Sequence, residues 1–286
     1  MKLLFTLIVL VIFQGCKLFN PDEQEPSFIL IDDFNVVTNS AQGSASHAVS
    51  EVWVYANGNI MGVYDVPAQI PVLYEGNTTI TAYAGIKNNG MGTTRIRYPF
   101  FVGADTVLNL KPTQTYQFNP FFEYASNADI DNSRNFEASN FFVEGPNNLG
   151  NLDVINDPDI AVNGAKCAYA TLASGDNYMH FIDDVDLTMQ GGNTIFLEMD
   201  YSCNNTFAFG VYVIEDGNTE KYPVIFITPT TSESGLNPAW NKIYLDFGAV
   251  ASAYPNADNF RIYFECVADE SATPTIFLDN LKVVSW

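Results

Sequence analysis

Residues 276–284 read Ile-Phe-Leu-Asp-Asn-Leu-Lys-Val-Val, a nearly continuous apolar run that closes a β-rich region. WNKIYLD at 240–246 and FRIYF at 260–264 precede it, and all three are rich in the branched and aromatic residues that strands favour. Similar runs, separated by turn residues, recur back to Phe136. The candidate strands of this region are 140–143, 165–173, 177–181, 194–202, 208–214, 222–228, 240–246, 259–267 and 275–284. They predict an antiparallel sandwich of the jelly-roll type over 136–286.

The same stretches resemble carbohydrate-binding modules of the galactose-binding-like jelly-roll type. In that family a W-x-x-hydrophobic strand, an F-R-I-x-F strand and a final Y/F-L-D-N-I/L-x-V strand recur. The resemblance covers 136–286 and is most specific at the last strand. It implies a β-sandwich and, beyond the architecture, sugar binding.

A second β-rich region precedes this one, over 26–126. EVWVY at 51–55 and the run 60–64 flank Asn57-Gly58, a strong hairpin signal. Turn residues recur at intervals of about 8 to 12 residues, which predicts a small immunoglobulin-like sandwich. The pattern from Val52 to Ile86 resembles PEGA-like and related immunoglobulin-like modules, which implies a spacer or adhesion element. The polar segment 127–135 is expected to link the two domains.

The amino terminus predicts export and a lipid anchor. Lys2 precedes an apolar run from Leu3 to Phe13, too short for the roughly 20 residues of a membrane span. Gly15-Cys16 follows and resembles a lipobox of the loose Bacteroidota type. We expect residues 1–15 to be a signal peptide, Cys16 to be lipidated, and 16–25 to form an acidic tether. An acidic cluster after the cysteine resembles the surface-export signal of such lipoproteins, and a solvated linker is the compatible alternative.

Composition narrows the partners. The chain of 286 residues carries 33 acidic and 12 basic side chains, for a net charge of −21. Such a body repels nucleic acid and anionic lipid, so we expect no nucleic-acid partner and membrane contact only through the lipid. Besides Cys16 the chain has three cysteines, Cys167, Cys203 and Cys266. Their spacing does not match a zinc site, and we expect buried thiols with at most one disulfide.

Aromatic side chains are the candidate ligand contacts, because sugar rings present apolar C–H faces that stack on flat rings. The candidates are Trp53, Tyr55, Tyr178, Tyr212 and Trp240. Trp53 and Tyr55 are two residues apart and share one face of their strand. Core packing is the competing interpretation for each of the five.

Acidic residues suggest two further sites. The jelly-roll resemblance implies a structural Ca²⁺ between Glu137 and Asp279, although Asp279 could instead satisfy backbone groups at a strand edge. Glu198 and Asp200 share a strand face and resemble part of the E-x-D-x-x-E run of jelly-roll glycosidases. The third carboxylate of that run is missing, so we expect no catalysis.

These features together predict a non-catalytic carbohydrate-binding lipoprotein of the outer membrane, exposed at the cell surface. An accessory or scaffold subunit of an outer-membrane protein complex is the main alternative, and a glycan-active hydrolase is the third. A glycan or an outer-membrane protein is the expected partner.

Overall fold

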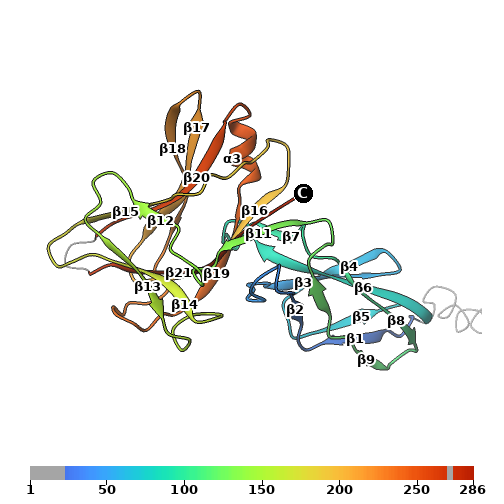
Figure 1. Cartoon of the computed structure of the whole chain (residues 1–286). Coiled ribbons are helices and arrows are strands. Elements are labelled where there is room, and N and C mark those ends of the chain that lie inside the picture. The colour runs from blue at the N-terminus through green and yellow to red at the C-terminus, as the bar shows by residue number, and fades with distance from the viewer. Residues whose placement is uncertain (1–22, 269–272) are drawn as a thin grey trace, which may run out of the picture.

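A computed structural model of the chain describes residues 23–268 and 273–286. The expected signal peptide, Cys16 and most of the tether lie outside this range. Figure 1 shows two β-rich lobes, an amino-terminal lobe (23–126) and a carboxyl-terminal lobe (127–286), joined near β11 (Asp129–Arg134). The prediction of an all-β protein built from two sandwiches is confirmed.

The carboxyl-terminal lobe contains two sheets whose pairings are all antiparallel. One follows the order β13-β14-β21-β16-β19, and β11 also pairs with β21. Its other strands are β13 (Asn151–Asn156), β14 (Lys166–Thr171), β16 (Ile195–Cys203), β19 (Asn241–Asp246) and β21 (Thr275–Ser285). The other sheet follows β12-β15-β20-β17-β18, formed by β12 (Phe142–Glu144), β15 (Tyr178–Asp183), β20 (Asn259–Val267), β17 (Phe207–Glu215) and β18 (Asn218–Ile227).

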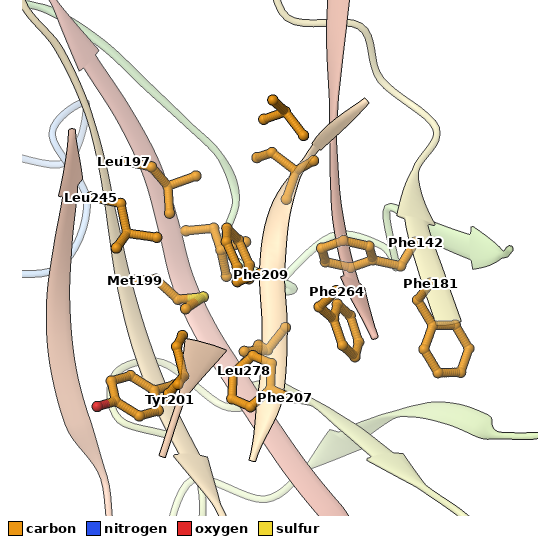
Figure 2. Packing of buried hydrophobic residues seen from close by; sticks show 14 of the residues in the cluster. Phe142, Phe181, Leu197, Met199, Tyr201, Phe207, Phe209, Leu245, Phe264 and Leu278 are labelled. Atoms are coloured by element: carbon orange, nitrogen blue, oxygen red, sulfur yellow. The ribbon is translucent and has the colours of Figure 1, made fainter. Parts of the chain in front are cut away.

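Alternation along each strand places one set of side chains between these two sheets. Figure 2 shows the result: Phe142, Phe181 and Phe264 from one sheet face Leu197 and Met199 from the other. The ring centroids of Phe142 and Phe264 lie 5.1 Å apart, in an edge-to-face arrangement. Truncating one such buried phenylalanine to alanine typically costs about 3–5 kcal/mol, so this layer holds the lobe together.

The amino-terminal lobe packs a larger sheet, β4-β3-β6-β7 with β8 on β6, against the smaller sheet β5-β1-β9 and the pair β10-β2. The larger sheet contains β3 (Glu51–Ala56), β4 (Asn59–Tyr64), β6 (Gly76–Lys87), β7 (Arg95–Arg97) and β8 (Ala104–Leu110). The others are β1 (Ser27–Ile31), β2 (Asn35–Val37), β5 (Ala68–Val72), β9 (Thr115–Gln117) and β10 (Phe121–Glu123). The predicted hairpin is confirmed: Asn57 and Gly58 have φ of 49° and 79°, as a tight primed turn requires.

The segment 127–135 differs from the expected linker. Residues 129–134 form β11, which pairs with β21 and so belongs to the carboxyl-terminal lobe. Asp129 and Asp131 are exposed, Asn132 donates to the Ala41 carbonyl at 2.8 Å, and Arg134 is buried and paired with Asp183. The polar composition hid a strand, because the alternation has few apolar residues to reveal it.

The two lobes share a buried interface. Phe196, Tyr244 and Val284 lie on the outer side of the β16-containing sheet and join the core cluster of the amino-terminal lobe. The ring centroids of Tyr98, from that lobe, and Phe196 are 5.6 Å apart. We call this sheet the covered sheet and the β20-containing sheet the open sheet, because the amino-terminal lobe packs on the first.

Cys167, Cys203 and Cys266 are buried and form no disulfide within the described range. Burial raises the pKa of the Cys203 thiol to about 11, so it stays protonated at neutral pH. A short helix, α3 (Gly248–Ala253), follows β19. In residues 23–268 and 273–286, no helix has the length and apolar character needed to cross a membrane.

Candidate functional site

The outer face of the open sheet gathers aromatic and charged side chains. Because strand residues alternate, Ile262 and Phe264 of β20 enter the core while Tyr263 and Glu265 face outward. The neighbouring strands β15 and β17, which flank β20 in Figure 1, are paired in register with it. This brings Tyr178 and His180 of β15, Tyr212 of β17 and Lys221 of β18 to the same face.

Glu265 is the polar centre of this face. Tyr178 donates its hydroxyl to Glu265 Oε2 at 2.5 Å, and Lys221 Nζ donates to the same oxygen. Burial opposes ionisation of Glu265, but the hydrogen bonds from Lys221 and Tyr178 outweigh it and lower the pKa of the carboxyl. Glu265 is therefore a carboxylate at neutral pH, able to accept further hydrogen bonds from a ligand.

His180 and Tyr212 form a second polar pair. His180 Nδ1 lies 3.4 Å from the carbonyl oxygen of Pro146, which can only accept, so Nδ1 carries the proton of the neutral ring. Nε2 then accepts from the Tyr212 hydroxyl at 3.2 Å. Burial lowers the pKa of His180 and keeps the ring neutral. Tyr212 is thus fixed in orientation at the rim of the face.

Tyr263 forms the floor beneath these groups. It is fully buried, and its hydroxyl finds no hydrogen-bond partner within the described part of the chain. Gly210 makes room for the ring, since a Cβ there would lie 2.9 Å from Tyr263 Cε1. A buried hydroxyl without a partner costs about 1–3 kcal/mol, so Tyr263 contributes its ring as a support beneath these groups and its hydroxyl lowers the stability of the lobe.

A groove of about 280 Å³ opens beside Glu265 and Tyr178. The small side chain of Ala208 forms part of its lining, and Phe226 and Val267 flank it with exposed fractions of 67% and 64%. Asn205 and Thr206 complete the lining. We name this groove, with Tyr212 and Tyr263 beside it, the open-sheet groove. An exposed flat ring next to a carboxylate fits a ligand that has apolar faces and many hydroxyls.

The five aromatic candidates from the sequence fall in three places. Tyr178 and Tyr212 meet at the open-sheet groove. Trp240 instead packs against Phe277, with ring centroids 5.9 Å apart, and donates its indole N–H to the Ile160 carbonyl at 2.8 Å. Trp53 and Tyr55 lie on β3 in the other lobe.

The groove also contains residues that the sequence did not single out. The prediction missed Tyr263, Glu265, Lys221 and Phe226. The alternation in FRIYFE at 260–265 could have shown that Tyr263 and Glu265 share the face opposite the core. Lys221 and Phe226 reach the site through strand pairing with β17, which no local pattern reveals.

Glu137 and Asp279 both hold the loop at 157–166. Glu137 Oε1 accepts from the backbone N–H groups of Ala165 and Lys166 at 2.8 and 3.0 Å. Asp279 accepts from Val162 N at 3.1 Å and from Asn280 N at 2.7 Å. These oxygens face N–H donors, an arrangement that does not fit a cation, and the described residues include no group of three or more acidic, histidine or cysteine side chains placed around a metal position. The Ca²⁺ site stays a prediction that these contacts do not support.

Glu198 and Asp200 lie in the interface between the lobes. Tyr98 and Tyr124 donate their hydroxyls to Glu198 Oε1 at 2.7 and 2.6 Å, and Lys242 Nζ lies 3.3 Å from Oε2. Burial opposes ionisation of Glu198, but Lys242, Lys282 and the two hydroxyls together lower its pKa. The carboxylate has no solvent exposure, so it holds the lobes together instead of facing a substrate.

No protein-family model and no curated protein matches the chain. Solved structures resemble it remotely. A family 11 carbohydrate-binding module from Clostridium thermocellum, in complex with a β-1,3-1,4-mixed-linked tetrasaccharide, has a TM-score of 0.39 and 12% identity, over 56% of this chain and 96% of that one. A carbohydrate-binding module of the β-sandwich superfamily has a TM-score of 0.38 and 12% identity, over 91% and 98%. The enzymatically active domain of bacteriophage CBA120 tailspike protein 4 has a TM-score of 0.35 and 12% identity, over 55% of this chain but only 19% of that one. At such low similarity, the fold rests on the strand pairing of this chain itself.

Proposed function

We propose that this protein is a non-catalytic carbohydrate-binding lipoprotein of the cell envelope, and that it binds its glycan in the open-sheet groove. The observation that carries the proposal is the meeting of Phe226 and Tyr178, as apolar ring surfaces, with the Glu265 carboxylate in one groove. The buried ring of Tyr263 supports this face from beneath. The solved structures of carbohydrate-binding modules that resemble this chain agree with this choice.

The chemistry favours a neutral glycan at this groove. Glu265 is ionised and lines the groove, so a polyanionic ligand meets repulsion at this position. A neutral sugar offers hydroxyl donors to Glu265 and a C–H face to Phe226. Burial of an apolar ring face contributes about 25 cal/mol of binding free energy per Å² of surface. Several sugar units must therefore stack to give useful affinity.

The direct test is titration calorimetry of the full-length protein in detergent against a panel of soluble neutral polysaccharides. Phe226→Ala and Tyr178→Ala should each weaken binding about tenfold or more, a loss of about 1.4 kcal/mol. Glu265→Gln, which keeps the shape but weakens the acceptor, should also weaken it. Phe121→Ala is the matched control, because Phe121 is 60% exposed but lies in the amino-terminal lobe.

Two results would contradict the proposal. If the protein binds no neutral glycan, or binds one with unchanged affinity in all three variants, the groove is not the site. Co-purification of a β-barrel partner under those conditions would favour the accessory-subunit alternative.

The membrane attachment is part of the same proposal and is tested separately. The apolar leader and Gly15-Cys16 support cleavage before Cys16 and lipidation there. The acidic residues that follow support export to the cell surface, with the PEGA-like amino-terminal lobe as a spacer. Mass spectrometry of the purified protein should find a diacylglyceryl group on Cys16, and Cys16→Ala should release the protein from membranes. An unmodified thiol would refute the anchor without touching the glycan proposal.

A further inference from the structure

The amino-terminal lobe has a second aromatic face, unrelated to the open-sheet groove. Val52 and Val54 of β3, with Ala82 and Ala84 of β6, point into the core of the lobe. The alternate residues Trp53, Tyr55 and Tyr83 therefore lie on the opposite side of the sheet, and each is partly exposed. Trp53 and Tyr83 are register partners, and Arg97 of β7 pairs with the next outward position of β6.

These side chains pack into one cluster. The rings of Tyr55 and Tyr83 meet edge to face at 5.5 Å. The guanidinium carbon of Arg97 lies 4.7 Å from the centre of the Tyr83 ring and 5.9 Å from that of Tyr55. Gly103 leaves room for Tyr83, since a Cβ at that position would come within 2.6 Å of the ring. Stacking on the two rings holds the guanidinium in place while its N–H groups stay available.

Arg97 stands apart from the other arginines. Arg95, Arg134 and Arg261 each form an ion pair with a carboxylate, whereas Arg97 forms none within the described range. The chain has 33 acidic residues, so an exposed arginine without a carboxylate is unusual here. The Trp53 indole N–H is also buried without a hydrogen-bond partner among the described residues.

The guanidinium N–H groups of Arg97 are thus donors without a carboxylate partner, whereas the open-sheet groove offers the Glu265 carboxylate as an acceptor; Glu51, on the other side of Gly85, directs one carboxylate oxygen to Arg95. Lys87 of β6 adds positive charge beside the cluster, whereas the charge of Arg95 on β7 is already balanced by Glu51 and Asp65. A ligand that fits must supply a carboxylate for the planar fork of Arg97 and a flat apolar face for the rings.

We propose that Trp53, Tyr55, Tyr83 and Arg97 form a second ligand site, which binds carboxylate-bearing sugars such as uronic acid units. The carboxylate pairs with the Arg97 guanidinium through two parallel hydrogen bonds, and the sugar ring packs against the exposed edge of the aromatic cluster. The site does not depend on the open-sheet groove, because it lies in the other lobe and has the opposite charge preference.

The test is binding of the full-length protein to a soluble polyuronate, compared with the same polymer after reduction of its carboxyl groups. Arg97→Gln should lose about tenfold or more in affinity for the polyuronate. Arg97→Lys, which keeps the charge but lacks the fork, should lose nearly as much. Binding should weaken as salt rises from about 0.1 to about 1 M, because the Debye length falls from about 10 to about 3 Å. Arg261→Gln, which removes an exposed arginine from the other lobe, is the matched control and should change nothing.

Several outcomes would overturn this proposal. They are failure of the wild type to bind the polyuronate, equal binding of the reduced polymer, unchanged affinity in Arg97→Gln, and equal affinity for a sulfated polymer that lacks carboxylates. Thermal unfolding of each variant checks that the lobe is intact. The affinity of the Arg97 variants for a neutral glycan should equal that of the wild type, because that ligand binds in the open-sheet groove. This measurement separates the two sites.

Discussion

Tyr98 and Glu198 come from different lobes, yet the Tyr98 hydroxyl donates to the Glu198 carboxylate at 2.7 Å and both side chains are almost fully buried. A hydrogen bond to a charged group contributes about 1.5–3 kcal/mol, more than most neutral ones. The pair therefore fastens the lobes together through a carboxylate that has no access to water.

Removing this hydroxyl should destabilise the whole protein. We expect Tyr98→Phe to lower the free energy of unfolding by about 1.5–3 kcal/mol, because Glu198 keeps its charge but loses one of its two tyrosine donors. Urea unfolding measures the change. The control is Tyr55→Phe, whose hydroxyl forms no hydrogen bond within the described range, and which should shift stability by less than about 0.5 kcal/mol. Equal effects in the two variants would contradict the role given to Glu198.

Asp279 should make stability depend on pH in an unusual direction. Burial raises the pKa of this carboxyl to about 7, outweighing the backbone hydrogen bonds that lower it. A folded pKa above the unfolded value means that the folded state binds the proton more tightly between about pH 4 and pH 7. The contribution of the Asp279 carboxyl to the free energy of unfolding is therefore greatest below about pH 4, and it is lost as the pH rises through about 7. The stability of the wild type relative to Asp279→Asn should fall by about 2–4 kcal/mol over this window in urea titrations. A pH-independent difference would refute the shift.

Gly210 should tolerate no side chain. A Cβ there would lie 2.3 Å from the Tyr222 carbonyl oxygen as well as close to the Tyr263 ring. We expect Gly210→Ala to cost about 1–3 kcal/mol and to disturb glycan binding by displacing Tyr263. Gly92→Ala is the matched control, because nothing lies within 4 Å of a Cβ at that position. Calorimetric unfolding measures the loss of stability, and the polysaccharide titration measures the loss of glycan affinity.

Trp240 should matter for stability and not for ligand binding. Trp240→Phe keeps the packing on Phe277 but loses the hydrogen bond to Ile160, so we expect a loss of about 1 kcal/mol. Glycan affinity should stay the same, in contrast to Tyr178→Ala. A selective loss of binding in Trp240→Phe would move the site to the covered sheet.

The lobe boundary is also testable with fragments. Fragments of residues 136–286 and 127–286 both lack the amino-terminal lobe and expose Phe196, Tyr244 and Glu198, but only the longer one keeps β11 paired with β21. We expect the shorter fragment to melt at a lower temperature than the longer one, and both to melt below the full chain. Identical melting temperatures for all three would show that the interface contributes nothing.

Much of this fold follows from local patterns, but the sites follow only in part. The alternation around FRIYF and the Asn57-Gly58 turn predicted strands and a hairpin correctly, because both signals lie within a few residues. The pairing of Tyr178 with Glu265 spans 87 residues and depends on strand order, which no single strand encodes. Glu198 resembled an active-site carboxylate because a strand pattern tells which face a side chain occupies, but not that another lobe covers that face.

The paired strand between the lobes has a mechanical consequence. Because β11 follows the amino-terminal lobe directly and is hydrogen-bonded to β21, and because Glu198 is buried in the contact between the lobes, we expect the two ligand faces to keep one relative orientation. A long polymer that binds one face therefore meets the other at a constant orientation. Binding at both faces then avoids the loss of conformational entropy that a flexible linker between the lobes would cause. Scattering in solution should accordingly report one particle shape that is the same with and without polymer.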